Sequence, residues 1–125
     1  MSLEVVMDDS ILDNLKRDLG VVVDDDVFDG EIIMAANTAF MTLHQLGVGP
    51  SDVFILTDNT QIWNDFTTDV DRLPMIKSYV FIRTRLLFDP PSNSQLASAL
   101  EDQRKEYEWR LNSAVELPSL GGDNE

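Results

Sequence analysis

The sequence predicts an all-α protein, a small bundle of about four helices with a short irregular or extended insertion near residues 51–71. Apolar residues recur at helical spacing in several segments, cap-forming residues precede these segments, and glycine or proline follows them. A chain of 125 residues is expected to form one domain. We assign the helical domain to residues 10–115, between a flexible N-terminus at 1–9 and a disordered acidic tail at 116–125.

Two helices are predicted in the N-terminal half. Ser10 is a candidate cap for a short helix over Ile11–Leu19, and Gly20 suits the left-handed position that follows a helix. A longer helix is expected from about Val27 to Leu46, where alanines within the apolar stripe allow a neighbouring helix to approach closely. Gly47 ends this helix.

The segment Leu73–Phe88 is apolar around nearly its whole circumference and predicts a third helix. Asp71 is its expected cap, and Pro90-Pro91 cannot continue it. A helix that is apolar on all sides is surrounded by protein. Either this helix is the centre of the bundle, or one of its faces meets another subunit.

A fourth helix is predicted from Ser92 to about Ala114, because Ser92 and Gln95 have the spacing of a capping box. One face of this helix is expected to pack on the core. It consists of Leu96, Leu100, Gln103, Tyr107, Leu111 and Ala114.

The segment 51–71 is the least regular part of the pattern. Phe54 lies in an apolar run that is too short to assign to a strand or a loop. Asp58 and Gln61 have capping-box spacing, which predicts a short helix through Trp63 and Phe66.

Composition and motifs point away from catalysis. The net charge of −14 disfavours binding to a phosphate backbone, and the chain has no cysteine. His44 is the only histidine and has no predicted partner for a triad or a metal site. The run Asp24–Asp26 fails the calcium-loop pattern, because Phe28 stands where an oxygen ligand belongs. We therefore predict no enzyme activity, no catalytic residue, no cofactor and no metal site, and no segment that spans a membrane.

Trp109 is the strongest candidate for an intermolecular contact. It lies about half a turn from Leu111, on the polar side of the fourth helix. The alternative is that the segment 51–71 folds over Trp109 and covers it within the same chain. Arg83 and Arg85 are further candidates, since they can pair with carboxylates of the same chain or with an acidic segment of a neighbouring subunit. Trp63 and Phe54 are the other two candidate residues for a contact with another subunit or a partner.

Three strings carry a resemblance to a known family: VFIRTRLLFDPP at residues 80–91, QRKEYEWRL at 103–111 and AFMTLHQLGVGP at 39–50. Together they cover most of the span from residue 10 to 112. The chain resembles the small head–tail connector proteins, also called neck or head-completion proteins, of tailed bacteriophages and prophages.

The resemblance implies a structural protein of the virion neck that assembles in the cytoplasm of the host bacterium. Its implied partners are its own copies in a ring, dodecameric in the virion, the portal protein, and a stopper or tail-completion protein. DNA would pass through the ring without specific binding. The alternative is an acidic protein-interaction module, such as a DNA-mimicking regulator, which needs rigid carboxylates on one face.

Overall fold

The structure is a computed structural model that describes the backbone of residues 7–123 and the side chains of residues 7–112. Five helices, and no strand, are present within that part of the chain. They are α2 (Ile11–Leu19), α3 (Asp29–Gln45), α4 (Trp63–Phe66), α5 (Leu73–Phe88) and α6 (Ser94–Asp123). The predicted all-α class is confirmed.

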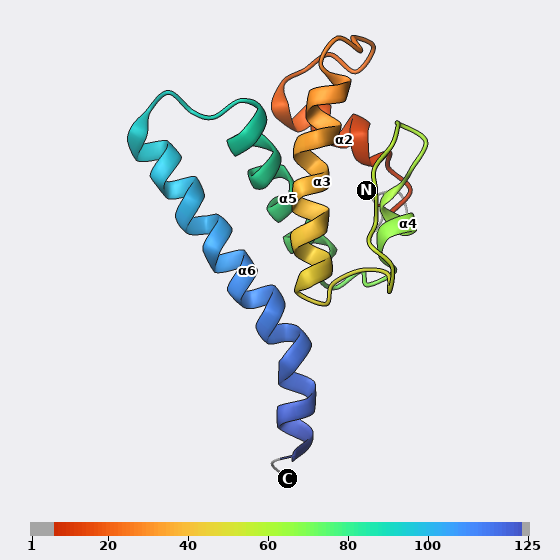
Figure 1. The fold of residues 1–125 in the computed structure, drawn as a ribbon, viewed down its shortest axis with the longest axis vertical. Coiled ribbons are helices and arrows are strands. Elements are labelled where there is room, and N and C mark those ends of the chain that lie inside the picture. The colour runs from red at the N-terminus through yellow and green to blue at the C-terminus, as the bar shows by residue number, and fades with distance from the viewer. Residues whose placement is uncertain (1–6, 124–125) are drawn as a thin grey trace.

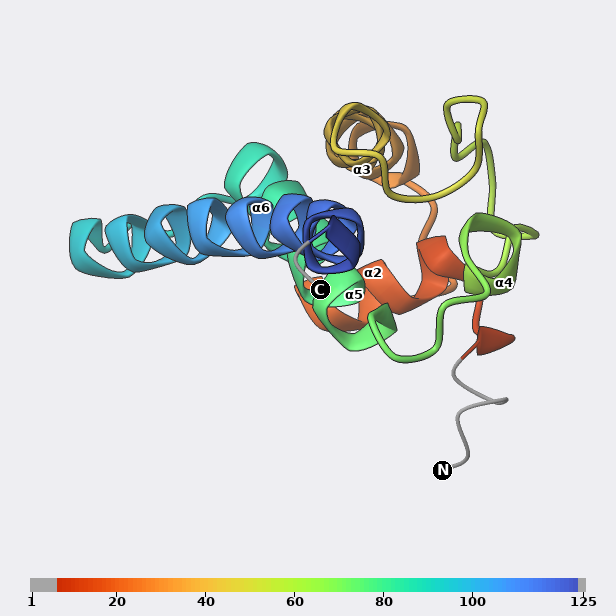
Figure 2. The ribbon, with the colours of Figure 1, turned by 90° about the horizontal axis from the view of Figure 1, so that it is seen from below.

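Helix α5 is the centre of the molecule. It packs on α3 and α6 and also contacts α2 (Figures 1 and 2). Ile76, Tyr79 and Val80 are fully buried, and the residues between Met75 and Leu86 are all buried or half-buried. Of the two arrangements that the sequence left open, the central position is the one observed for this helix.

The N-terminal half follows the sequence pattern closely. Ser10 caps α2, because its Oγ accepts a hydrogen bond of 3.2 Å from the backbone N–H of Asp13. Gly20 follows α2 with φ of 81°, as predicted for a left-handed C-terminal residue. Residues 1–6 of the predicted flexible N-terminus lie outside the described residues. Met7 is buried in the core.

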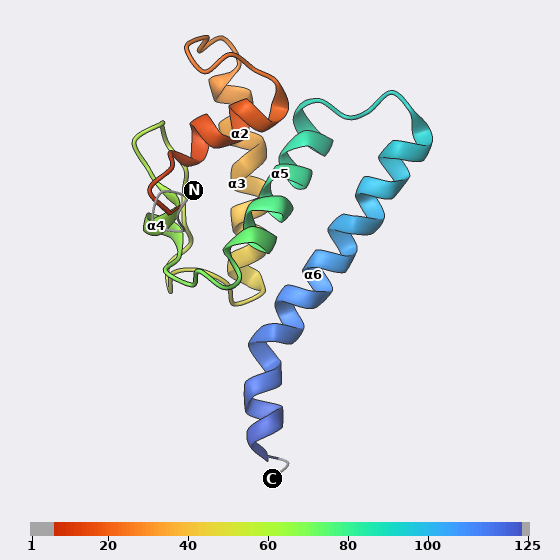
Figure 3. The ribbon, with the colours of Figure 1, turned by 180° about the vertical axis from the view of Figure 1, so that it is seen from behind.

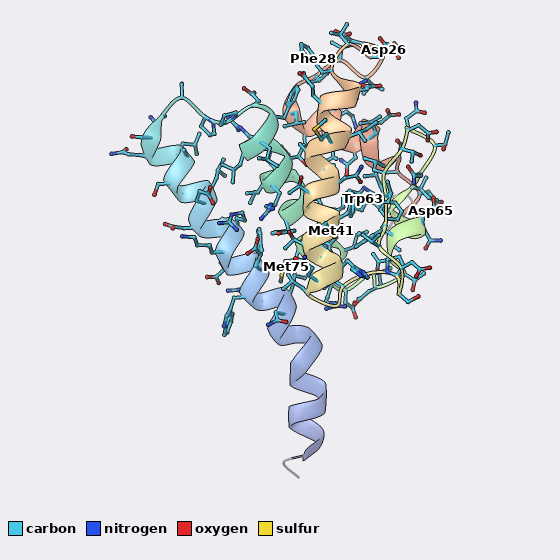
Figure 4. The ribbon with its side chains drawn as sticks, viewed as in Figure 1. Asp26, Phe28, Met41, Trp63, Asp65 and Met75 are labelled. Carbon is cyan, nitrogen blue, oxygen red and sulfur yellow. The ribbon has the colours of Figure 1, made fainter. Side chains whose placement is uncertain are left out.

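The segment 51–71 covers the side of α2 and α3 that faces away from α6 (Figures 1 and 2). Asn37 on α3 binds both backbone groups of Leu56, with its Nδ2 3.0 Å from the carbonyl oxygen and its Oδ1 2.7 Å from the amide nitrogen. The indole N–H of Trp63 donates to Asn14 Oδ1 at 3.0 Å (Trp63 is labelled in Figure 4). These bonds satisfy polar groups that would otherwise be unpaired in the core.

Aromatic rings join this segment to α3. The Phe40 ring lies 4.9 Å from that of Phe54 and 5.0 Å from that of Phe66, between ring centroids. Gly49, at φ of 101°, lies against Phe66, and a Cβ there would come within 2.6 Å of the ring. A glycine is therefore required at this position.

Three predicted cap residues are wrong. The short helix begins at Trp63, because the Asp65 carboxylate accepts from Ile62 N–H, while Asp58 accepts from Thr60 in the preceding turn. Helix α5 begins after Arg72, and Asp71 makes no capping bond to it. Helix α6 is capped by Asn93, whose Oδ1 accepts from the N–H groups of residues 95 and 96, instead of by Ser92.

Helix α6 also differs from its prediction in packing and in length. It diverges from α5 toward its N-terminal end (Figures 1 and 3), so Leu96 and Gln103 are exposed, while Tyr107 and Leu111 reach the core. The helix continues past Ala114 to Asp123, where the sequence predicted a disordered tail from residue 116. Adding a residue to an existing helix costs less than starting one, which favours this extension. Residues 124–125 lie outside the described part.

Phe40→Ala tests the aromatic core. The substitution leaves a cavity among Phe54, Trp63 and Phe66, and we expect it to lower the free energy of unfolding by about 3–5 kcal/mol. The neighbouring residue Met41 is exposed, and Met41→Ala should cost less than about 1 kcal/mol. Chemical denaturation measures both values. Similar losses for the two variants would contradict this core assignment.

Candidate functional site

A single carboxylate fastens α6 to α5. Glu108 Oε2 accepts hydrogen bonds from the Tyr79 hydroxyl at 2.7 Å, from Arg83 Nη1 at 3.0 Å and from Arg104 Nη1 at 2.9 Å. Arg104 also donates to Glu101 at 2.7 Å. Bonds to charged groups are stronger than neutral ones, so this cluster fixes α6 on the body at the level of residue 108.

The surroundings of Glu108 and Tyr79 shift both pKa values. Partial burial acts to raise the pKa of Glu108, but the hydrogen bonds from Tyr79 and Arg104 and the charges of Arg104 and Arg83 outweigh it, so the pKa is lowered. Burial, followed by the hydrogen bond to Glu108, raises the pKa of Tyr79 above its ordinary value. Tyr79 therefore remains a neutral donor and Glu108 an ionised acceptor at neutral pH.

The outer face of α6 carries Trp109, whose side chain is 70% exposed. The segment 51–71 does not cover it, because that segment lies across α2 and α3 (Figure 2). Lys105 stands one helical turn before Trp109 on the same face and is also exposed. Within residues 7–112 no carboxylate lies within salt-bridge distance of Lys105. An exposed indole beside a free ammonium group is a surface suited to binding another protein.

The structure does not gather the five sequence-predicted contact residues into one site. Arg83 is used inside the protomer by Glu108, and Arg85 Nε lies 3.4 Å from the backbone oxygen of Asp89. Trp63 is fully buried, and Phe54 packs against the core. The Trp63 indole fills the space between α2 and α3, so the protomer presents no Trp63 surface to another subunit. Phe54 is half-buried against the core, so only part of its side chain is accessible to another subunit.

A groove that the sequence analysis missed lies between α3 and the adjoining ends of α5 and α6. Exposed Met34 and Leu87 line it, together with Thr38, Arg83 and Arg104. Leu87 belongs to the segment that is apolar around nearly its whole circumference, and Met34 lies on α3. Their exposure follows from the divergence of α6, which sequence periodicity does not report.

Lys16 is a second feature that the sequence analysis missed. Its side chain is 1% exposed, and its ammonium nitrogen lies 2.8 Å from the carbonyl oxygens of Val23 and Asp25 and 2.7 Å from Asp29 Oδ1. A buried ammonium group is tolerated only when its donors are used. Lys16 therefore holds the connection between α2 and α3 in one conformation.

The described part of the chain offers no alternative site with evident chemistry. No group of three or more His, Cys, Asp or Glu side chains among the described residues is placed to hold a metal ion. No helix in the same part is long and apolar enough to cross a membrane.

Comparison with known proteins agrees with an assembly role. A family model described as phage connector protein matches residues 11–117. The chain belongs to the phage connector protein family. This confirms the resemblance carried by the three sequence strings, and the family is a structural, non-enzymatic kind of protein of the phage neck. No curated protein and no solved structure matches the chain.

Glu108→Gln should destabilise this connector protein in a pH-dependent way. The folded-state pKa of Glu108 lies below its ordinary value of 4.5, so its stabilising contribution is present above that pH and is lost as the pH falls through the lowered pKa. Urea denaturation at about pH 7 and about pH 3 should show a larger deficit for the variant at the higher pH.

Glu106→Gln is the matched control for Glu108→Gln. Glu106 forms an exposed ion pair with Arg110, and its loss should change stability little at either pH. An equal deficit for Glu108→Gln at both pH values would contradict the assigned charge state of Glu108.

Proposed function

We propose that this phage connector protein forms a ring beneath the portal, joins the head to the tail and extends the channel through which DNA passes. The portal protein on one side and a stopper or tail-completion protein on the other are its proposed partners. By the family resemblance the ring is dodecameric in the virion neck, and it assembles in the cytoplasm of the host. The observation that carries the proposal is the exposed Trp109 on a helix that Glu108 fixes in place, in a chain that belongs to the connector family.

The charge distribution supports passage of DNA without binding. The chain has 23 acidic residues against nine Lys and Arg. Of the described cations, six are already within 4.0 Å of a carboxylate in the same protomer. Few positive charges remain to displace counterions from a phosphate backbone. A channel lined by such a surface repels DNA and lets it slide.

Trp109→Ala should impair assembly far more than folding. Loss of a large aromatic anchor can cost about 2 kcal/mol or more of interface energy, whereas an exposed substitution should cost the isolated protomer less than about 1 kcal/mol. Leu111, two residues away and fully buried, is the matched control, and Leu111→Ala should destabilise the protomer by about 2–5 kcal/mol.

The measurements for Trp109→Ala are chemical denaturation of each variant and co-sedimentation with the portal protein. Normal assembly of Trp109→Ala on the portal would show that Trp109 is not part of the interface. Failure of the unaltered protein to bind the portal would overturn the connector function itself.

Duplex DNA should not bind this protein tightly. In a gel-shift assay at about 50 mM salt we expect no retarded band at micromolar protein, because protein and DNA are both strongly negative. Sub-micromolar binding with a steep dependence on salt concentration would contradict a passive channel wall.

A further inference from the structure

The connection between α2 and α3 presents apolar and acidic side chains to solvent together. Val22 is 68% exposed and Val27 is 73% exposed, and the three aspartates at 24–26 between them are exposed as well. The connection lies at the end of the molecule where α3 begins (Asp26 and Phe28 are labelled in Figure 4). We refer to residues 21–28 as the acidic loop.

The acidic loop is fixed in shape although it projects from the body. The buried ammonium group of Lys16 binds two of its carbonyl oxygens, those of Val23 and Asp25. Asp25 Oδ1 also accepts from the backbone N–H of Val27 at 3.1 Å. A loop that is already ordered loses little conformational entropy when it binds, which favours association.

The charges of the protomer are separated between its two halves. Residues 7–71 contain 14 acidic side chains and two cations, whereas residues 72–110 contain five acidic side chains and seven cations. Three cations have no carboxylate of residues 7–112 within 4.0 Å, namely Lys77, Arg85 and Lys105, and all three lie on α5 or α6. The Lys77 ammonium group lies 5.8 Å from the ring centroid of Trp63 in α4, which leaves Arg85 and Lys105 as the cations without such a contact.

We propose that the acidic loop of one copy docks against the outer face of α6 in the next copy. Val22 and Val27 would pack on the exposed indole of Trp109, and the loop aspartates would face Lys105. This inference rests on the proposed ring and identifies the two surfaces that form it. The pairing places the two valines against the indole and the loop aspartates against Lys105, the cation of this face that has no carboxylate partner within residues 7–112.

The same two surfaces disfavour a symmetric dimer. Two acidic loops placed face to face would bring six aspartates together, and two outer faces of α6 would oppose their lysines. The acidic loop and α6 also flank different sides of the central helix α5 (Figures 1 and 3). A contact between two different surfaces is heterologous, and such contacts generate a ring when the rotation closes.

A charge exchange in the full-length protein tests the pairing. The loop variant is Asp24→Lys with Asp26→Lys, and the face variant is Lys105→Glu. Asp25 is left unchanged because it binds within the loop. Each variant alone should reduce the amount of connector bound to the portal protein by about tenfold or more, measured by sedimentation with the portal as nucleus. All three substitutions in one chain should restore assembly to within about threefold of the unaltered protein.

Asp52→Lys with Asp71→Lys is the matched control, since it makes the same change in net charge at two exposed positions outside the loop. It should assemble like the unaltered protein. A chain with all three substitutions that is no better than the single-surface variants would overturn the pairing, as would a control that loses assembly to the same extent as the loop variant. A loop variant that forms the ring but loses a stopper protein would also overturn it. Failure of the unaltered protein to assemble on the portal would instead reject the proposed function.

Discussion

The structure depends on one constraint, which is that α5 is apolar around nearly its whole circumference and must be covered by the other helices along most of its length. Helix α3 packs against one side, and α2 contacts another. Helix α6 covers a third side near Tyr107 and Leu111 and then diverges, so that its other end stands clear of the body (Figure 3). The Glu108 cluster lies where this contact begins. Both the exposed groove and the presentation of Trp109 follow from the way in which α5 is covered.

Local signals in the sequence were sufficient to predict the helices whose ends are determined by neighbouring residues. Ser10 and Gly20 mark α2, and the apolar stripe marks α3 within two residues of its observed start. The errors arise where distant residues decide the outcome. Trp63 is buried with its indole N–H hydrogen-bonded to Asn14, which lies 49 residues away in the sequence. Ser92 and Asn93 are both cap-forming residues near the start of α6, and spacing alone does not distinguish them. The path of the chain in the folded protein determines that Asn93 is the cap.

The candidate site was predictable in part for the same reason. The exposure of Trp109 follows from its angular position relative to Leu111, which helical geometry fixes. The partner of Arg83 could be predicted only as a carboxylate, since the choice of Glu108 depends on how α5 and α6 cross. The role of Lys16 left no signal in the periodicity, because a lysine on a short helix is ordinarily solvated. Its burial depends on the folding back of a loop whose shape the sequence does not specify.

The Lys16 contacts have a consequence for how this protein can vary. Two of the three acceptors around its ammonium group are main-chain carbonyl oxygens, which residues of any type supply. The side chains at positions 22, 24, 26 and 27 can therefore be exchanged while the loop keeps its path, provided that Lys16 and Asp29 remain. The shape of the loop is in this way uncoupled from its surface chemistry. Substitutions at these positions can change the charge and hydrophobicity of the loop surface without rebuilding the fold.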